Sequence, residues 1–485
     1  MLFNSYIFIL FFLPVALLSY FGLNRLGKEV QAKWVLVGMS LWFYAYFHVT
    51  YLVLIIGSIL FNFFCSKLIC RQNGMMKRML CALGVIANIG VIFYFKYFNF
   101  FLENINLLFR SGFITDKILM PLGISFFTFQ QISYLVDSYR METGDYSFVD
   151  YALFVTFFPQ LIAGPIVLHG EMIPQFCDKT RKRPDMDKLA RGIRLFAIGL
   201  FKKVMIADVL GRGADWGFAN AGITTAVDVV LVSVLYTLQI YFDFSGYCDM
   251  ACGIASMFHL ELPVNFNSPY KATSILEFWQ RWHITLTRFL RTYIYFPLGG
   301  NRKGKIRTMW NVLIVFLVSG IWHGAAWTFI LWGAVHGIAN VLCRLFHNIW
   351  DKFPRLLRWM MTFAFVDLAW IIFRADSLEE AGVLFGKLVQ PWKWQVSGGL
   401  IEQFHLLEFT YVEEHVPFLG SFVNQFPAVH LLVVLSLALC VALIPANCHE
   451  KKFKPGVWNA LGSTVLLVWS IVSLSGLTTF LYFNF

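Results

Sequence analysis

The chain has 485 residues, of which 58% are hydrophobic and only 14% charged, and its formal net charge is +11. Because a soluble domain carries roughly 25% charged residues, this composition excludes an ordinary soluble protein. It predicts an all-α bundle that crosses a membrane many times. The positive excess fits cytoplasmic loops and lipid headgroups, and without a nucleic-acid-binding module it does not indicate a nucleic-acid partner.

The nine cysteines are scattered and form no CxxC pair. Cys248 and Cys252 are one helical turn apart, but no histidine pair accompanies them, so we interpret them as packing residues. We therefore expect no disulfide framework, no metal site and no bound cofactor. The chain also lacks the GxSxG, HExxH and GxxxxGK[ST] motifs, which disfavours a serine hydrolase, a zinc protease and a P-loop pump.

Apolar segments that are long enough, or nearly long enough, to span a membrane recur along the chain. The first begins near Tyr6 without a leading basic region, so we interpret it as a retained span and not a signal peptide. We predict 11–13 spanning or re-entrant helices in a single domain of residues 1–485. The segments lie at residues 5–23, 34–47, 49–66, 79–100, 150–168, 192–210, 226–246, 309–322, 325–346, 357–374, 429–446 and 457–478.

Lysine and arginine cluster in alternate loops, which gives a consistent orientation when those loops face the cytoplasm. The strongest basic loop covers residues 179–194, and others follow the first and third spans or precede the spans at 309–322 and 457–478. Both termini are then predicted to lie outside. The longest polar loop, residues 376–428, is also predicted outside and leans acidic.

Two segments have the pattern of neither a loop nor a clean span. Residues 121–131 are apolar but carry Ser, Thr and Gln, and residues 262–270 contain two prolines. Since irregular backbone at membrane depth must be satisfied by protein or water, these segments predict a funnel around a polar cavity. Residues 277–295 place apolar residues at helical spacing opposite a polar face, which predicts one helix near the cytoplasmic interface.

His323 is the first candidate for chemistry, because it lies at the break between two apolar segments. An ionisable residue at membrane depth is costly and by default indicates function. Gly320 and Gly324 flank it and permit close approach of backbone or substrate, and an imidazole is suited to moving protons near neutral pH. The alternative is a packed histidine that is hydrogen-bonded to a carbonyl group.

His283 is the second candidate, within the amphipathic segment 277–295. Two histidines, one deeper and one nearer the cytoplasm, could act as a base and its orienting partner. The alternative is a residue of the aromatic belt at headgroup depth.

Asp243, Ser245 and Asp249 lie in an apolar stretch, where a carboxylate is costly unless it is paired or faces water. We expect Asp243 to pair with an arginine such as Arg281 or to line the cavity, and a structural ion pair is the alternative to direct chemistry. Asn311 precedes His323 by roughly 18 Å along a continuous helix, so we interpret it as a packing or tunnel residue.

The chain ends in an aromatic tail, residues 480–485, that contains one hydroxyl group, on Tyr482. A tyrosine in this position can be an aromatic anchor at the outer membrane interface. Alternatively, it can be a nucleophile that carries an acyl group transiently.

Several motifs in one order give a more specific signal than any single histidine. Through them the chain resembles the membrane-bound O-acyltransferases, and most closely the bacterial branch that acetylates alginate and peptidoglycan. The resemblance covers nearly the whole chain. The motifs lie at residues 121–131, 157–165, 241–250, 277–286, 298–304, 322–325 and 480–485.

The resemblance implies a helical bundle with a funnel and a tunnel through a thin centre. It also implies that His323, which follows Trp322, matches the family's essential intramembrane histidine and that His283 matches a second important histidine. Members move an acyl group from a cytoplasmic thioester toward an extracytoplasmic acceptor, which implies a bacterial inner-membrane location. A companion protein of the related D-alanyl transfer systems ends in a similar motif, so Tyr482 becomes a candidate acyl relay.

Together these features predict an O-acetyltransferase that uses acetyl-CoA, or another acyl thioester, as its donor substrate. His323 is expected to act as general base and His283 to position or activate it. The expected partner is an extracytoplasmic O-acetyltransferase or another polysaccharide-modifying protein. Five basic residues are candidates to attract the phosphates of the donor: Arg281, Arg288, Arg302, Lys303 and Lys305.

Two other functions stay open on the residues alone. One is a transporter of a polar lipid or glycan, with His323 and Asp243 as a proton relay. The other is a non-catalytic scaffold that recruits an envelope transferase, for which the histidines would be dispensable.

Overall fold

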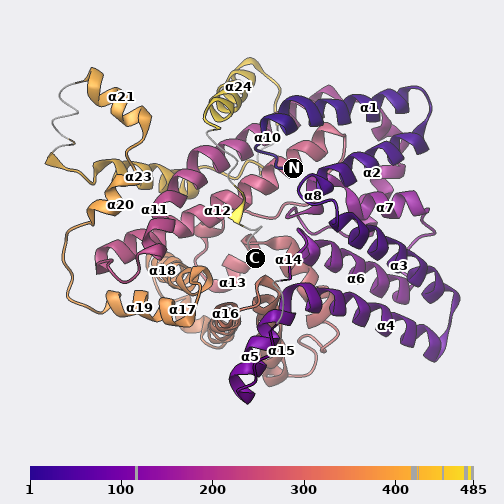
Figure 1. Cartoon of the computed structure of the whole chain (residues 1–485), viewed down its shortest axis with the longest axis horizontal. Helices are drawn as coiled ribbons and strands as arrows, with labels where there is room; N and C mark the ends of the chain where they lie inside the picture. The colour runs from indigo at the N-terminus through magenta and orange to yellow at the C-terminus, as the bar shows by residue number, and fades with distance from the viewer. Residues whose placement is uncertain (115–117, 417–422, 424, 451–452, 475–478, 482–485) are drawn as a thin grey trace. The chain divides into compact units, whose positions relative to one another are not determined.

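The computed structural model describes the chain except for residues 115–117, 417–422, 424, 451–452, 475–478 and 482–485. Within the described residues all regular structure is helical and no strand forms (Figure 1). The predicted all-α class is therefore confirmed.

Seven helical runs among the described residues are long and apolar enough to cross a membrane. Two shorter apolar helices, α23 (Val429–Leu443) and α24 (Val457–Val472), fall below that length. Fewer helices reach spanning length than the sequence predicted, because some apolar segments are short or interrupted. The seven are Phe8–Arg25, Tyr51–Arg71, Gly74–Phe109, Ala226–Met257, Lys305–His323, Trp327–Leu345 and Arg355–Arg374.

Residues 150–168 do not form the predicted span. The helix α7 (Phe148–Thr156) ends at Phe157, where ψ is 108°, and α8 (Phe158–Leu161) is a single turn. Pro159 suits the first turn of α8, where its missing N–H is tolerated. The apolar run is therefore continuous in sequence but broken in backbone.

The segment 376–428 is not the long polar loop that the sequence predicted. Its described residues include α19 (Leu378–Leu388), α20 (Gly398–Glu402) and α21 (Leu407–His415). The first of these begins where the Ser377 hydroxyl accepts a hydrogen bond from the Glu380 backbone N–H, which is a standard helix cap.

The chain forms two compact units. Unit 1 comprises residues 1–200, 247–265 and 453–485. Most of its long helices run side by side (Figure 1). They are α1 (Leu13–Arg25), α2 (Glu29–Ala45), α3 (Tyr51–Arg71), α4 (Gly74–Ile92) and α6 (Ile124–Arg140).

A buried amide network joins three of these helices. Asn62 Nδ2 on α3 donates to Gln131 Oε1 on α6 at 2.5 Å and to Asn88 Oδ1 on α4 at 3.1 Å. Asn88 Nδ2 returns a bond to Asn62 Oδ1 at 2.7 Å. Such hydrogen bonds between helices hold a bundle together where packing against lipid supplies little driving force.

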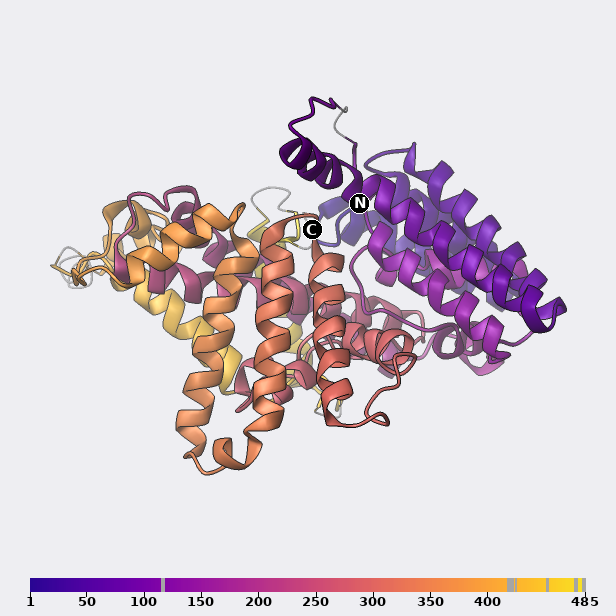
Figure 2. The same cartoon turned by 90° about the horizontal axis from the view of Figure 1, so that it is seen from below.

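Unit 2 comprises residues 201–246 and 266–452. Figure 2 shows three of its helices side by side: α15 (Lys305–His323), α16 (Trp327–Leu345) and α18 (Arg355–Arg374). A Cβ on Gly320 would lie 2.3 Å from the Phe329 carbonyl oxygen, and one on Gly333 would lie 2.5 Å from the Phe316 carbonyl oxygen. These two glycines therefore set the distance between α15 and α16.

The rest of unit 2 supplies shorter elements around these helices. The helix α12 (Ala226–Met257) places its residues up to 246 in unit 2. Residues 262–270, of which only 266–270 belong to unit 2, are irregular, as predicted, apart from the 3-10 turn η5 (Pro269–Lys271) at their end. Two short helices follow, α13 (Ile275–Arg281) and α14 (Ile284–Leu290).

Candidate functional site

His323 is the last residue of α15 and lies at a break between two apolar helices, as predicted. The next residue, Gly324, is extended, and a Cβ there would lie 2.1 Å from the Phe329 ring, so only glycine fits. The His323 side chain is buried, with 5% of the residue exposed. Its ring centroid lies 5.3 Å from that of Trp332 and 5.2 Å from that of Phe373.

His283 lies in a break between α13 and α14, and the predicted single helix over residues 277–295 is wrong. Trp282 is extended, and His283 takes the left-handed conformation with φ 46°. A π-helical segment, η6 (Arg291–Tyr295), then follows α14. Buried apolar residues recur at helical spacing on both α13 and α14. Periodicity alone therefore could not reveal the break between the two helices.

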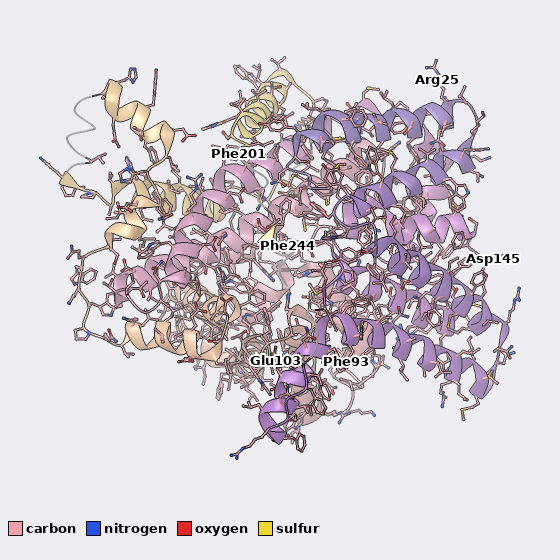
Figure 3. All side chains as sticks on the ribbon, viewed as in Figure 1. Arg25, Phe93, Glu103, Asp145, Phe201 and Phe244 are labelled. Carbon is pink, nitrogen blue, oxygen red and sulfur yellow. The ribbon has the colours of Figure 1, made fainter. Side chains whose placement is uncertain are left out.

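His283 is enclosed by aromatic rings and only 1% exposed. Its ring packs nearly perpendicular to that of Phe244 of α12, at a centroid distance of 4.9 Å, and Phe244 is labelled in Figure 3. Burial lowers the pKa of His283 from its ordinary 6.5 to about 3, because a charged imidazole loses its hydration there. His283 is therefore a neutral imidazole at physiological pH.

The fold of unit 2 brings the two predicted histidines together. Their ring centroids are 6.4 Å apart, with the planes inclined at 61°. The Trp322 ring lies against both, 6.0 Å from His283 and 4.9 Å from His323. Two imidazoles in an enclosure of aromatic rings can hold and move a proton where bulk water is excluded.

Asp243 does not pair with Arg281. Lys203 Nζ lies 2.7 Å from Asp243 Oδ1 and 2.8 Å from Asp208 Oδ1. The side chains of Lys203 and Asp243 are each only 2% exposed. Lys203 thus compensates the buried charge of Asp243, which alone would be very costly there, while its second partner, Asp208, is 22% exposed.

Arg281 has other partners. Its guanidinium lies 2.9 Å from Glu277 Oε1, one helical turn earlier, and donates to the Asn267 carbonyl oxygen at 3.2 Å. Arg281 thus ties α13 to the irregular segment before it. Ser245, the third polar residue of the 239–250 stretch, accepts a hydrogen bond from Lys202 Nζ at 3.5 Å.

Asn311 holds the loop that precedes α15. Its Nδ2 donates to the Gly300 carbonyl oxygen at 2.8 Å. The loop presents Arg302 and Lys303, and α15 begins with Lys305; all three side chains are exposed. Asn311 therefore orders a basic, solvent-facing loop at the end of α15 opposite to His323.

Comparison with known proteins identifies the family. The profile of the membrane-bound O-acyltransferase family matches residues 114–378. All of the chain aligns with the peptidoglycan O-acetyltransferase of Helicobacter pylori, with 42% identity and 98% of that relative covered. The chain belongs to the membrane-bound O-acyltransferase family.

Other relatives agree. The chain is 40% identical to the probable alginate O-acetylase of Pseudomonas aeruginosa, over 82% of the chain and 76% of that relative. It is 27% identical to the teichoic acid D-alanyltransferase of Bacillus subtilis, over 52% of the chain and 68% of that relative. The predicted resemblance is thus confirmed. This member of the membrane-bound O-acyltransferases is a multi-pass membrane enzyme, and the transporter and scaffold alternatives are set aside.

Three predicted site residues remain to be placed. Asp249 is buried on the section of α12 that belongs to unit 1. Arg288 is half-buried on α14. Tyr482 lies outside the described residues, so only the start of the aromatic tail is placed: Phe480 packs against Tyr247, with ring centroids 5.0 Å apart.

Sequence reasoning missed Lys203, the partner of Asp243, and two residues near His323, namely Trp332 and His336. The rule that an ionisable residue in an apolar segment indicates function applied equally to Lys203, within residues 192–210, and to His336, within residues 325–346. Trp332 carried no such signal, because a tryptophan in an apolar helix is ordinary.

Proposed function

We propose that this enzyme moves an acetyl group from a cytoplasmic thioester, acetyl-CoA, to hydroxyl groups of a cell-envelope polysaccharide, with peptidoglycan as the favoured acceptor. The family relationship supports O-acyl transfer in a membrane. The full-length similarity to a peptidoglycan O-acetyltransferase favours peptidoglycan, and alginate is the second candidate because alginate O-acetylases are nearly as similar.

The observation that carries the proposal is the pairing of His283 and His323, with ring centroids 6.4 Å apart inside an aromatic enclosure. His323 acts as general base and takes the proton of the acceptor hydroxyl as its oxygen attacks the thioester carbonyl. The C–S bond then breaks and the proton passes to the departing thiolate. His283 acts as the neutral partner that positions the reacting groups, because burial holds its pKa well below the ordinary range and keeps the imidazole uncharged.

The donor is proposed to dock at the cytoplasmic end of α15. Arg302, Lys303 and Lys305 are exposed there, and clustered positive charge attracts the phosphates of coenzyme A. Arg288, on α14, is proposed to contribute to the same field. Arg281 is not included, because its guanidinium already binds Glu277 and the Asn267 carbonyl oxygen.

On the outer side, the acetyl group is proposed to reach the polymer directly or through Tyr482 and a separate extracytoplasmic transferase. In this orientation both termini and residues 376–428 lie outside the bacterial inner membrane, so α19 and its neighbours are available to that partner. Asp243 and Asp249 are proposed to support the tunnel and not to take part in bond formation.

Transfer of label from radiolabelled acetyl-CoA to the purified protein in nanodiscs tests the proposal. Wild type is expected to release coenzyme A, and His323→Ala is expected to lose this activity. Label that is lost in both His323→Ala and Tyr482→Phe supports the tyrosine relay, whereas label lost only in His323→Ala removes the relay and keeps the transferase. Unchanged release of coenzyme A by His323→Ala would contradict the assigned base.

A further inference from the structure

A third buried histidine lies next to the pair and has no part in the proposed chemistry. His336 is in the middle of α16 and is fully buried. Its ring centroid is 4.8 Å from that of Trp332, whose other neighbour is His323 at 5.3 Å. His336 therefore contacts the same ring on which His323 packs.

The partner of His336 fixes its protonation. Trp279 Nε1, on α13, lies 3.3 Å from His336 Nδ1. An indole N–H can only donate, so Nδ1 must accept and the imidazole is neutral with its proton on Nε2. Among the described residues no hydrogen-bond acceptor meets that Nε2, so the Trp279 bond is the polar contact through which His336 acts in this structure.

This bond joins α13, which ends next to His283, to α16, which packs against the helix that carries His323. Trp279 is one helical turn before His283, in the helix that ends at the break where His283 lies. Trp332 is one turn before His336 on α16, which is locked to α15 and hence to His323 by glycine contacts. The Trp279 and Trp332 rings also meet directly, with centroids 5.7 Å apart.

The rings around His336 form an apolar environment that does not by itself require a histidine. Phe316, Phe365 and Trp370 surround its ring at centroid distances of 6.4, 5.3 and 6.5 Å. An aliphatic residue of similar size would suit this environment and would leave no buried Nε2–H without an acceptor. A polar group that lowers stability while linking two parts of a site is expected where function requires it.

We propose that His336 is a positioning residue, whose Nδ1 holds Trp279 and thereby sets the separation of His283 from His323 for acyl transfer. This inference rests on the proposed function. In this inference α16 not only packs against α15 but also carries the acceptor atom, His336 Nδ1, that fixes the orientation of α13. A shift of about 1 Å between reacting groups lowers rates by as much as about 100-fold, so one hydrogen bond at this point is enough to matter.

The test uses a nearly isosteric pair of substitutions. His336→Asn keeps an acceptor oxygen close to the position of Nδ1, whereas His336→Leu has the same shape without it. Both are expressed in cells that lack the native gene, and base-labile acetate is measured in the isolated cell-envelope polymers, normalised to the folded protein in the membrane. We expect His336→Asn to keep at least about a third of wild-type acetylation and His336→Leu to lose about tenfold, with similar melting temperatures.

A second substitution approaches the same bond from the other side. Trp279→Phe removes the donor, so it should lower acetylation like His336→Leu, and combining the two should lower it little further. Equal activity of His336→Asn and His336→Leu, or additive losses in the double variant, would overturn the inference. Full activity of His323→Ala in the same assay would overturn the proposed function instead, so the two failures are distinguishable.

Discussion

Unit 1 and unit 2 each bury a cluster of polar side chains among apolar helices, but the two clusters are built differently. In unit 1, Asn62, Asn88 and Gln131 bond directly to one another at 2.5–3.1 Å. In unit 2, His283 and His323 pack mainly against aromatic rings, at centroid distances near 5 Å. Amides that bond to one another across helices hold those helices together, whereas two imidazoles enclosed by aromatic rings can hold and move a proton away from bulk water.

The largest expected effect separates the two clusters by function. His323→Ala should lower acetyl transfer by about 10²–10⁴-fold, the usual contribution of a general base, while the protein stays folded. Asn88→Ala should instead lower stability by about 0.6–2 kcal/mol and leave the transfer rate per folded molecule close to wild type. Acetate content and melting temperature of both variants check this, and a reversed pattern would show that the clusters were assigned the wrong way round.

The next effect tests the charges of unit 2. Lys203→Met leaves Asp243 buried without its cation, which should cost about 3–5 kcal/mol. Adding Asp243→Asn to Lys203→Met should recover much of that loss, because the uncompensated charge is removed. Thermal unfolding in detergent measures both. If the double variant is no more stable than Lys203→Met alone, the two side chains are not coupled as the 2.7 Å contact indicates.

A smaller effect tests helix spacing in the two units. Gly333→Ala places a Cβ 2.5 Å from the Phe316 carbonyl oxygen, which should separate α15 from α16 and cost about 1–3 kcal/mol. It should also lower acetylation, because α16 positions the ring beside His323. Gly57→Ala on α3 of unit 1 has no atom within 4 Å of the new Cβ, so it serves as the control and should be neutral or slightly stabilising.

The smallest effect is a dependence on pH. The folded-state pKa of His283 is about 3, below its ordinary 6.5, so the unfolded chain binds this proton first. The contribution of His283 to stability is therefore complete above pH 6.5 and is lost as the pH falls toward 3, by at most about 1.4 kcal/mol per pH unit. Melting temperatures at pH 7.5, 6.5 and 5.5 should show a shallower decline for His283→Asn than for wild type, and identical declines would contradict the buried, neutral imidazole.

The sequence predicted a feature correctly where a single local pattern determines it. His323 lies at the predicted break because glycine and an ionisable residue interrupt an apolar run. Its proximity to His283 could not be predicted from spacing, since it depends on how α13, α15 and α16 pack. The family resemblance predicted that both histidines are functional, but it did not predict the distance between them.

The errors have physical reasons. Asp243 was expected to pair with an arginine such as Arg281 or to line the cavity. Arg281 instead binds Glu277 through an i, i+4 contact, and the observed partner of Asp243 is Lys203, 40 residues away along the chain. The helix predicted over residues 277–295 was wrong because periodicity does not register a two-residue break. The helix α19 was missed although Ser377 and Glu380 have the spacing of a helix cap.

The left-handed backbone of His283 also limits what can replace it. At φ 46°, glycine and asparagine are tolerated, most other residues are strained, and β-branched residues most of all. In a saturation library at this codon, variants would therefore be ranked first by conformational strain and only then by the chemistry of the side chain. His283→Ala combines backbone strain with loss of the imidazole. The effect of losing the imidazole alone is therefore best measured with His283→Asn and His283→Gly.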